Sequence, residues 1–84
     1  YPNPFNPTTT ISYQIPAMTN VQLIIYDVLG REIKTLIDEI KPAGKYNVAW
    51  DGTDNYGNSV SSGIYFYKLI AGSFVQTKKM ILMK

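Results

Sequence analysis

The sequence contains neither cysteine nor histidine. Without cysteine the chain can form no disulfide framework and no thiolate zinc site, and without histidine it lacks the commonest metal ligand and general base. The serines therefore have no ordinary base to activate them as nucleophiles. We expect a noncatalytic chain that holds no cofactor, while the absence of cysteine identifies no compartment.

Charge is also scarce. Charged residues make up 17% of the chain and the net charge is +2, which is too small to indicate a nucleic-acid partner. The charge is unevenly spread: residues 1–54 hold four basic and six acidic side chains, whereas residues 55–84 hold four lysines and no acid. This basic end is typical of a solvated edge strand and equally of a binding patch.

The chain lacks an apolar run of membrane-spanning length and a signal peptide, so we expect no stable membrane insertion. It begins at Tyr1 rather than at Met, which is typical of a piece of a longer protein. Its 84 residues predict one domain, 1–84, with a stiff proline-rich leading segment at 1–8. We expect this segment to pack Phe5 under the domain rather than to act as a proline-rich ligand, because no PxxP repeat is sustained.

Alternation of apolar and polar residues is the strongest pattern present. It predicts strands at 9–15, 21–27, 31–39, 45–50, 62–71 and 74–84. The second of these is apolar on both faces and is predicted to be central, while a slip between Ile33 and Leu36 indicates a bulge or a short helix. Turn residues separate the strands, so we predict an all-β, immunoglobulin-like antiparallel β-sandwich of six or seven strands.

Acids and amides gather after Trp50. Asp51 and Asp54 are three residues apart and no Glu follows them, so the spacing does not match an EF-hand loop. An irregular calcium site formed by Asp51, Asp54 and Asn55 stays open, beside a turn in which these side chains bond to nearby amides. Two carboxylates within one turn do not flank a cleft, which argues against a glycosidase.

Aromatic residues are abundant, with seven tyrosines and one tryptophan. Alternation predicts that Trp50, Tyr65 and Tyr67 point into the core, which leaves Tyr26 and Tyr56 for stacking on a sugar. The residues expected to anchor the fold are Phe5, Trp50, Gly52, Gly63, Tyr65 and Tyr67.

Six separated stretches, in order, resemble one known family. They are 1–11 (YPNPFNPTTTI), 25–30 (IYDVLG), 43–44 (AG), 50–52 (WDG), 62–67 (SGIYFY) and 78–84 (KKMILMK). The whole chain resembles the type A C-terminal sorting domain of the type IX (Por) secretion system. Its middle portion also resembles the immunoglobulin-like domain of the flagellar hook-capping protein.

The resemblance to the sorting domain implies a module at the C-terminus of secreted proteins of the Bacteroidetes and related phyla. Its implied partners are an attached cargo domain, the outer-membrane secretion machinery that recognises it in the periplasm, and a sortase-like peptidase that commonly removes it. The cargo then reaches the cell surface or the medium. In the family the recognition signal lies on the final strand. By position, the resemblance therefore assigns it to Lys78, Lys79, Met80, Ile81, Leu82, Met83 and Lys84.

A second hypothesis is a structural or carbohydrate-binding immunoglobulin-like accessory domain of a secreted multidomain protein. It is motivated by the predicted sandwich and by the polar loop that follows Trp50.

Overall fold

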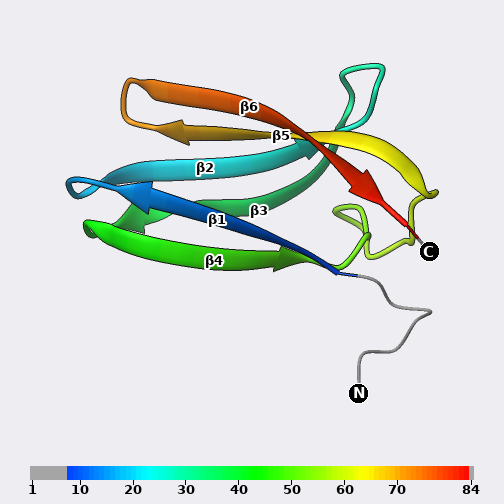
Figure 1. Ribbon diagram of the computed structural model, residues 1–84, viewed down its shortest axis with the longest axis horizontal. Helices are drawn as coiled ribbons and strands as arrows, with labels where there is room; N and C mark the ends of the chain where they lie inside the picture. Colours follow the sequence, from blue (N-terminus) through cyan, green and yellow to red (C-terminus); the bar gives the residue numbers. More distant parts are fainter. Residues whose placement is uncertain (1–7, 84) are drawn as a thin grey trace.

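The computed structural model describes residues 8–83, and the regular structure in this range consists entirely of β-strands. They are β1 (Thr9–Ile15), β2 (Thr19–Tyr26), β3 (Glu32–Lys41), β4 (Gly44–Trp50), β5 (Gly63–Ala71) and β6 (Phe74–Leu82) (Figure 1). A helix long and apolar enough to cross a membrane is absent from residues 8–83.

The strands form two antiparallel sheets of unequal width. The smaller sheet pairs β1 with β4, and the larger has the order β3-β2-β5-β6. β2 therefore lies inside the larger sheet, as its two apolar faces predicted, and β3 and β6 form its two edges. In Figure 1, β6 borders the larger sheet at the top. The predicted all-β, immunoglobulin-like antiparallel sandwich is confirmed, with six strands.

The core lies between the inward faces of the two sheets. Its fully buried members include Trp50 of β4, Leu23 of β2 and Leu82 of β6. The Trp50 ring meets the Tyr65 ring edge to face, with centroids 5.1 Å apart, a favourable arrangement for aromatic pairs. The ten buried core residues are Ile11, Tyr13, Ile15, Val21, Leu23, Ile25, Trp50, Tyr65, Leu69 and Leu82.

The irregular pattern of β3 arises from two interruptions of its pairing with β2. Leu23 pairs with Ile37 while Ile24 pairs with Thr35, so Leu36 is an extra residue. Ile25 pairs with Lys34 while Tyr26 pairs with Glu32, so Ile33 is a second extra residue. Both extra residues pack against the core, which explains why the apolar positions slip out of strict alternation. The predicted bulge is confirmed, and the short helix is absent from this strand.

Two turns of the same design appear within residues 8–83, at 27–31 and at 54–58. In the first, Gly30 donates its N–H to the Asp27 carbonyl at 3.0 Å and has φ of +80°. In the second, Gly57 donates to the Asp54 carbonyl at 3.0 Å and has φ of +84°. Each aspartate carboxylate also accepts two backbone N–H groups of its own turn. The sequence pattern Asp-x-x-Gly-x thus encodes a turn closed by its aspartate.

Two tyrosines fasten the ends of strands to the chain four residues earlier. The Tyr46 hydroxyl donates to the Pro42 carbonyl at 2.5 Å, and the Tyr65 hydroxyl donates to the Ser61 carbonyl at 2.6 Å. This is the hydrogen bond of a tyrosine corner, a feature typical of immunoglobulin-like sandwiches.

The ends of the chain differ from the sequence expectations. The last strand was predicted to reach Lys84, but β6 ends at Leu82 and Met83 lies beyond it. Lys84 and the expected anchor Phe5 both lie outside the described residues. Ala71 pairs with Phe74, so only Gly72 and Ser73 connect β5 and β6.

Candidate functional site

The polar loop that follows β4, residues 51–62, is the first candidate suggested by the sequence. It folds back on itself: Val60 donates its N–H to the Gly52 carbonyl at 2.9 Å, and Thr53 and Ser59 form an isolated antiparallel bridge. The Trp50 indole donates to the Thr53 carbonyl at 2.9 Å, so the buried ring also holds the start of the loop. The loop is therefore a small ordered hairpin attached to the core.

The side chains proposed as calcium ligands have partners within the protein. The Asp51 carboxylate accepts from the hydroxyl and the amide of Thr53 at 2.6 and 3.1 Å, and these hydrogen bonds lower the pKa of Asp51. Asp54 closes its own turn. Asn55 uses its side-chain oxygen on Thr35. Turn chemistry thus accounts for each candidate, although the calcium site itself stays an untested prediction.

Among residues 8–83 no three Asp, Glu, His or Cys side chains gather in a way that could hold a metal ion. The sequence contains neither Cys nor His, so any such group could consist only of carboxylates. The two acids of the loop point to separate sets of amides rather than toward a shared centre.

Asn55 fastens the loop to the edge of β3. Its N–H donates to the Ile33 carbonyl at 2.9 Å, and its side-chain oxygen accepts the N–H of Thr35 at 2.9 Å. Its side-chain amide donates to Glu32 at 3.2 Å. The Lys34 ammonium meets the Asp54 carbonyl at 3.2 Å. The loop therefore continues the hydrogen bonding of the sheet beyond β3, a structural role that sequence reasoning missed.

The aromatic residues considered for sugar stacking do not form a surface platform. The indole of Trp50 is fully buried, and Tyr65 is 7% exposed. Tyr56 is 89% exposed at the tip of the loop, while Tyr26 is half-buried on the outer face of β2. Of the expected anchors in the described range, Trp50 and Tyr65 lie in the core and Tyr67 packs against it.

The two expected glycine anchors have different surroundings. Gly52 has φ of +77°, and a Cβ built on it would lie 3.2 Å from Leu82 of β6. The loop and the last strand therefore meet at this point, where a side chain would not fit without displacement. Gly63 begins β5 with φ of +149°, and nothing lies within 4 Å of its would-be Cβ.

The strand expected to carry the recognition signal is the other edge of the larger sheet. Within residues 8–83, β6 pairs with β5 alone. Lys78, Lys79, Ile81 and Met83 are exposed, whereas Met80 is half-buried and Leu82 is in the core. The segment thus divides into side chains that hold the strand in place and side chains that face solvent.

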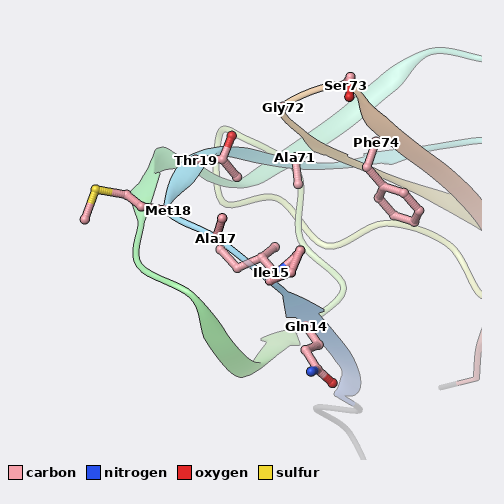
Figure 2. A pocket seen from close by; sticks show the side chains of 10 residues that line it. Gln14, Ile15, Ala17, Met18, Thr19, Ala71, Gly72, Ser73 and Phe74 are labelled. Atoms are coloured by element: carbon pink, nitrogen blue, oxygen red, sulfur yellow. The ribbon is translucent and has the colours of Figure 1, made fainter.

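A cavity of about 550 Å³ lies at one end of the sandwich (Figure 2). It is bounded by the end of β1 with the β1–β2 connection and, across from them, by the turn between β5 and β6. Its walls include Ile15, Met18 and Phe74, and the lining residues contain no charged group. Such a surface can bind an apolar side chain but supplies no acid or base for catalysis. Sequence reasoning missed it because its two walls lie far apart in the chain.

A two-layer antiparallel sandwich with tyrosine corners defines the chain as a domain of the immunoglobulin-like class. The family whose model matches, over residues 5–73, is described as the FlgD Ig-like domain. The match covers most of the chain, which therefore belongs to the FlgD Ig-like domain family. It ends at Ser73, one residue before β6 begins.

Solved structures lead to the same family. Three chains of known structure match, among them the crystal structure of FlgD from P. aeruginosa. That structure has a TM-score of 0.70 and 26% sequence identity to this chain, and the alignment covers 89% of this chain and 58% of that one. This chain therefore spans less than two thirds of the FlgD chain. None of the curated proteins matches the sequence.

Proposed function

We propose that this domain is a noncatalytic sorting module, which directs an attached cargo protein across the bacterial outer membrane through the type IX secretion machinery. The proposal begins from the spaced sequence motifs, from YPNPF at the start to KKMILMK at the end. Under this proposal the module is periplasmic in transit and reaches the cell surface or the medium. A sortase-like peptidase is its second partner.

The observation that carries the proposal is β6, an edge strand of the larger sheet that holds the lysines implicated by the motif resemblance. That strand is an edge with exposed lysines and exposed apolar side chains. An exposed edge strand on a stable sandwich is a suitable recognition element, because its backbone and its side chains are both accessible.

The test is export of a periplasm-targeted fluorescent protein fused to residues 1–84, in a host that carries the type IX system. Removal of 78–84 alone would be ambiguous, because it deletes the core residue Leu82. The informative variant replaces Lys78, Lys79 and Ile81 by serine and retains Leu82. We expect export to be lost although the fusion stays folded.

Lys45→Ser on β4 is the matched control, since Lys45 is also exposed but lies on the smaller sheet. We expect it to be exported like the parent fusion. Equal export of the triple variant and the control would overturn the assignment of the signal. Failure of the parent fusion itself to be exported would overturn the proposed function.

A structural role in a hook-capping protein is the second candidate, favoured by the family match and by the likeness to FlgD. In that case the domain would act as part of a flagellar assembly rather than as an export signal. The two candidates differ in a simple observation: fusion to this domain would leave the export of a foreign cargo unchanged if the role were purely structural.

A further inference from the structure

The backbone groups of β6 alternate in direction, and the structure fixes which of them point outward. Gly72, directly after β5, donates its N–H to the Asn20 carbonyl on the β2 side at 3.3 Å. Directions alternate along a strand, so the odd-numbered residues of β5 point their backbone groups toward β6. The β6 residues that pair with these odd-numbered residues point their own backbone groups back toward β5. They are Phe74, Gln76, Lys78, Met80 and Leu82. The N–H and C=O groups pointing away from the sheet thus belong to Val75, Thr77, Lys79 and Ile81.

This edge is regular along its whole length. The pairing of β5 with β6 runs from Gly63–Leu82 to Ala71–Phe74 without a register shift, in contrast to the two shifts in β3. Regular strands leave evenly spaced outward groups, which is the arrangement that an added strand requires. Val75 and Ile81 are 54% and 59% exposed, so the same edge offers apolar side chains on the outer face.

Charge limits what can pair with this edge. Arg31 and Lys41 form ion pairs with Asp27 and Glu39, but Lys78 and Lys79 have no ion pair among residues 8–83. A second copy of β6 would bring these lysines close to their own equivalents, and like charges across strands are destabilising. An acidic strand would instead place its carboxylates opposite them, one on each face of the sheet.

The cavity at the end of the sandwich lies on the core-facing side of this edge. Phe74 is part of its wall and is 54% exposed (Figure 2). A residue paired with Phe74 on an added strand would point to the same face of the sheet as the Phe74 ring. An apolar residue at that position would be covered by the ring and would approach the cavity.

We propose that β6 accepts an antiparallel strand from an acidic partner segment, which pairs with the outward groups of Val75, Thr77, Lys79 and Ile81. Two neighbouring acids of the partner face Lys79 and Lys78, and aliphatic residues face Ile81 and Val75. This inference rests on the proposed function, since it names the chemistry by which a receptor of the secretion machinery would read the terminal strand.

The first test titrates the full chain, labelled with ¹⁵N, with the peptide Thr-Val-Thr-Glu-Glu-Thr-Thr-Val-Thr up to millimolar concentration. The two glutamates of this peptide align with Lys79 and Lys78 when its valines face Ile81 and Val75. We expect chemical-shift changes along β6 and slower exchange of the amides of Val75, Thr77, Lys79 and Ile81. A control peptide with lysines in place of the glutamates should bind at least about tenfold more weakly.

Two variants separate backbone pairing from charge attraction. Thr77→Pro removes an outward N–H but no bond to β5, so it should abolish binding while Thr77→Val retains it. Lys78→Glu combined with Lys79→Glu should reverse the preference in favour of the lysine peptide. The spectra of the free variants report whether each is folded.

Absence of binding to the glutamate peptide, or equal binding by the Thr77→Pro and Thr77→Val variants, would overturn the inference. The export assay separates this failure from failure of the proposed function. Export that depends on Lys78, Lys79 and Ile81 but is unaffected by Thr77→Pro would retain the sorting module and reject strand addition. Binding of the glutamate peptide by a domain that directs no export would retain strand addition at β6 and reject the sorting module.

Discussion

The two edges of the larger sheet differ in what covers them. At β3, the loop that follows β4 bonds to Ile33 and Thr35, so the unpaired backbone groups of this part of the edge have partners. At β6, the outward groups face solvent beside two lysines that have no ion pair among residues 8–83. An open edge invites pairing with other chains, and folded proteins normally cover or charge it. Here the loop covers part of one edge, and the other edge carries exposed lysines.

This difference reverses the first impression given by the sequence. The loop rich in Asp and Asn is the segment that resembles a ligand site, yet Asn55 and Asp54 use their side chains to build the loop and attach it to β3. The plainer strand β6 holds backbone groups that have no partner strand among residues 8–83. Polar residues within a turn therefore indicate local structure before they indicate a ligand.

The largest expected effect comes from replacing Trp50, the buried residue that holds the loop beside β3. Trp50→Ala should lower the free energy of unfolding by about 3–5 kcal/mol, because it empties a fully buried site and breaks the bond from the indole to the loop. Chemical denaturation of the variant measures this loss. A loss below about 1 kcal/mol would mean that Trp50 contributes little to the core.

A second substitution tests the contact between the loop and β6. Gly52→Ala should cost about 1–3 kcal/mol, because φ is +77° and the new Cβ would lie 3.2 Å from Leu82. Gly57→Ala is the matched control: it has φ of +84° but nothing within 4 Å, so it should cost only the conformational strain of about 1 kcal/mol. Equal losses would show that the contact with Leu82 contributes nothing.

A third substitution opens the covered edge. Asn55→Ala should cost about 1 kcal/mol and speed the hydrogen exchange of the Thr35 amide, because it removes the acceptor of that N–H. Asn58→Ala should change stability by less than about 0.5 kcal/mol, because only the backbone of Asn58 takes part in its turn. Unchanged exchange at Thr35 would contradict the covering role of Asn55.

The smallest expected effect on stability occurs at the open edge. Replacement of Lys78 and Lys79 together by threonine should change the free energy of unfolding by less than about 0.5 kcal/mol, because both side chains are exposed and lack ion pairs within residues 8–83. The variant should nevertheless self-associate, which sedimentation at increasing protein concentration measures. A variant that stays monomeric would show that charge is not what protects β6.

Alternation allowed most of this fold to be predicted from the sequence. The two apolar faces of β2 indicated its central place, and the inward positions of Trp50 and Tyr65 followed from the period of two. The bulges at Ile33 and Leu36 were visible only as a slip in the pattern, because a bulge and a single helical turn displace apolar residues in similar ways.

Other features could not be predicted from the sequence, because they depend on the three-dimensional arrangement of the strands and loops. The bond between Asn55 and Thr35 joins residues on separate elements, and no local pattern encodes it. The cavity beside Phe74 also depends on how the β1–β2 connection meets the turn after β5. The free edge of β6 followed from the strand order, which alternation does not determine.

The contrast between the two edges can be measured directly by hydrogen exchange of the free domain, amide by amide. We expect Thr35 to be protected on the β3 edge, while Val75, Thr77, Lys79 and Ile81 exchange rapidly between protected neighbours on β6. Uniform protection along β6, or rapid exchange at Thr35, would contradict this expectation.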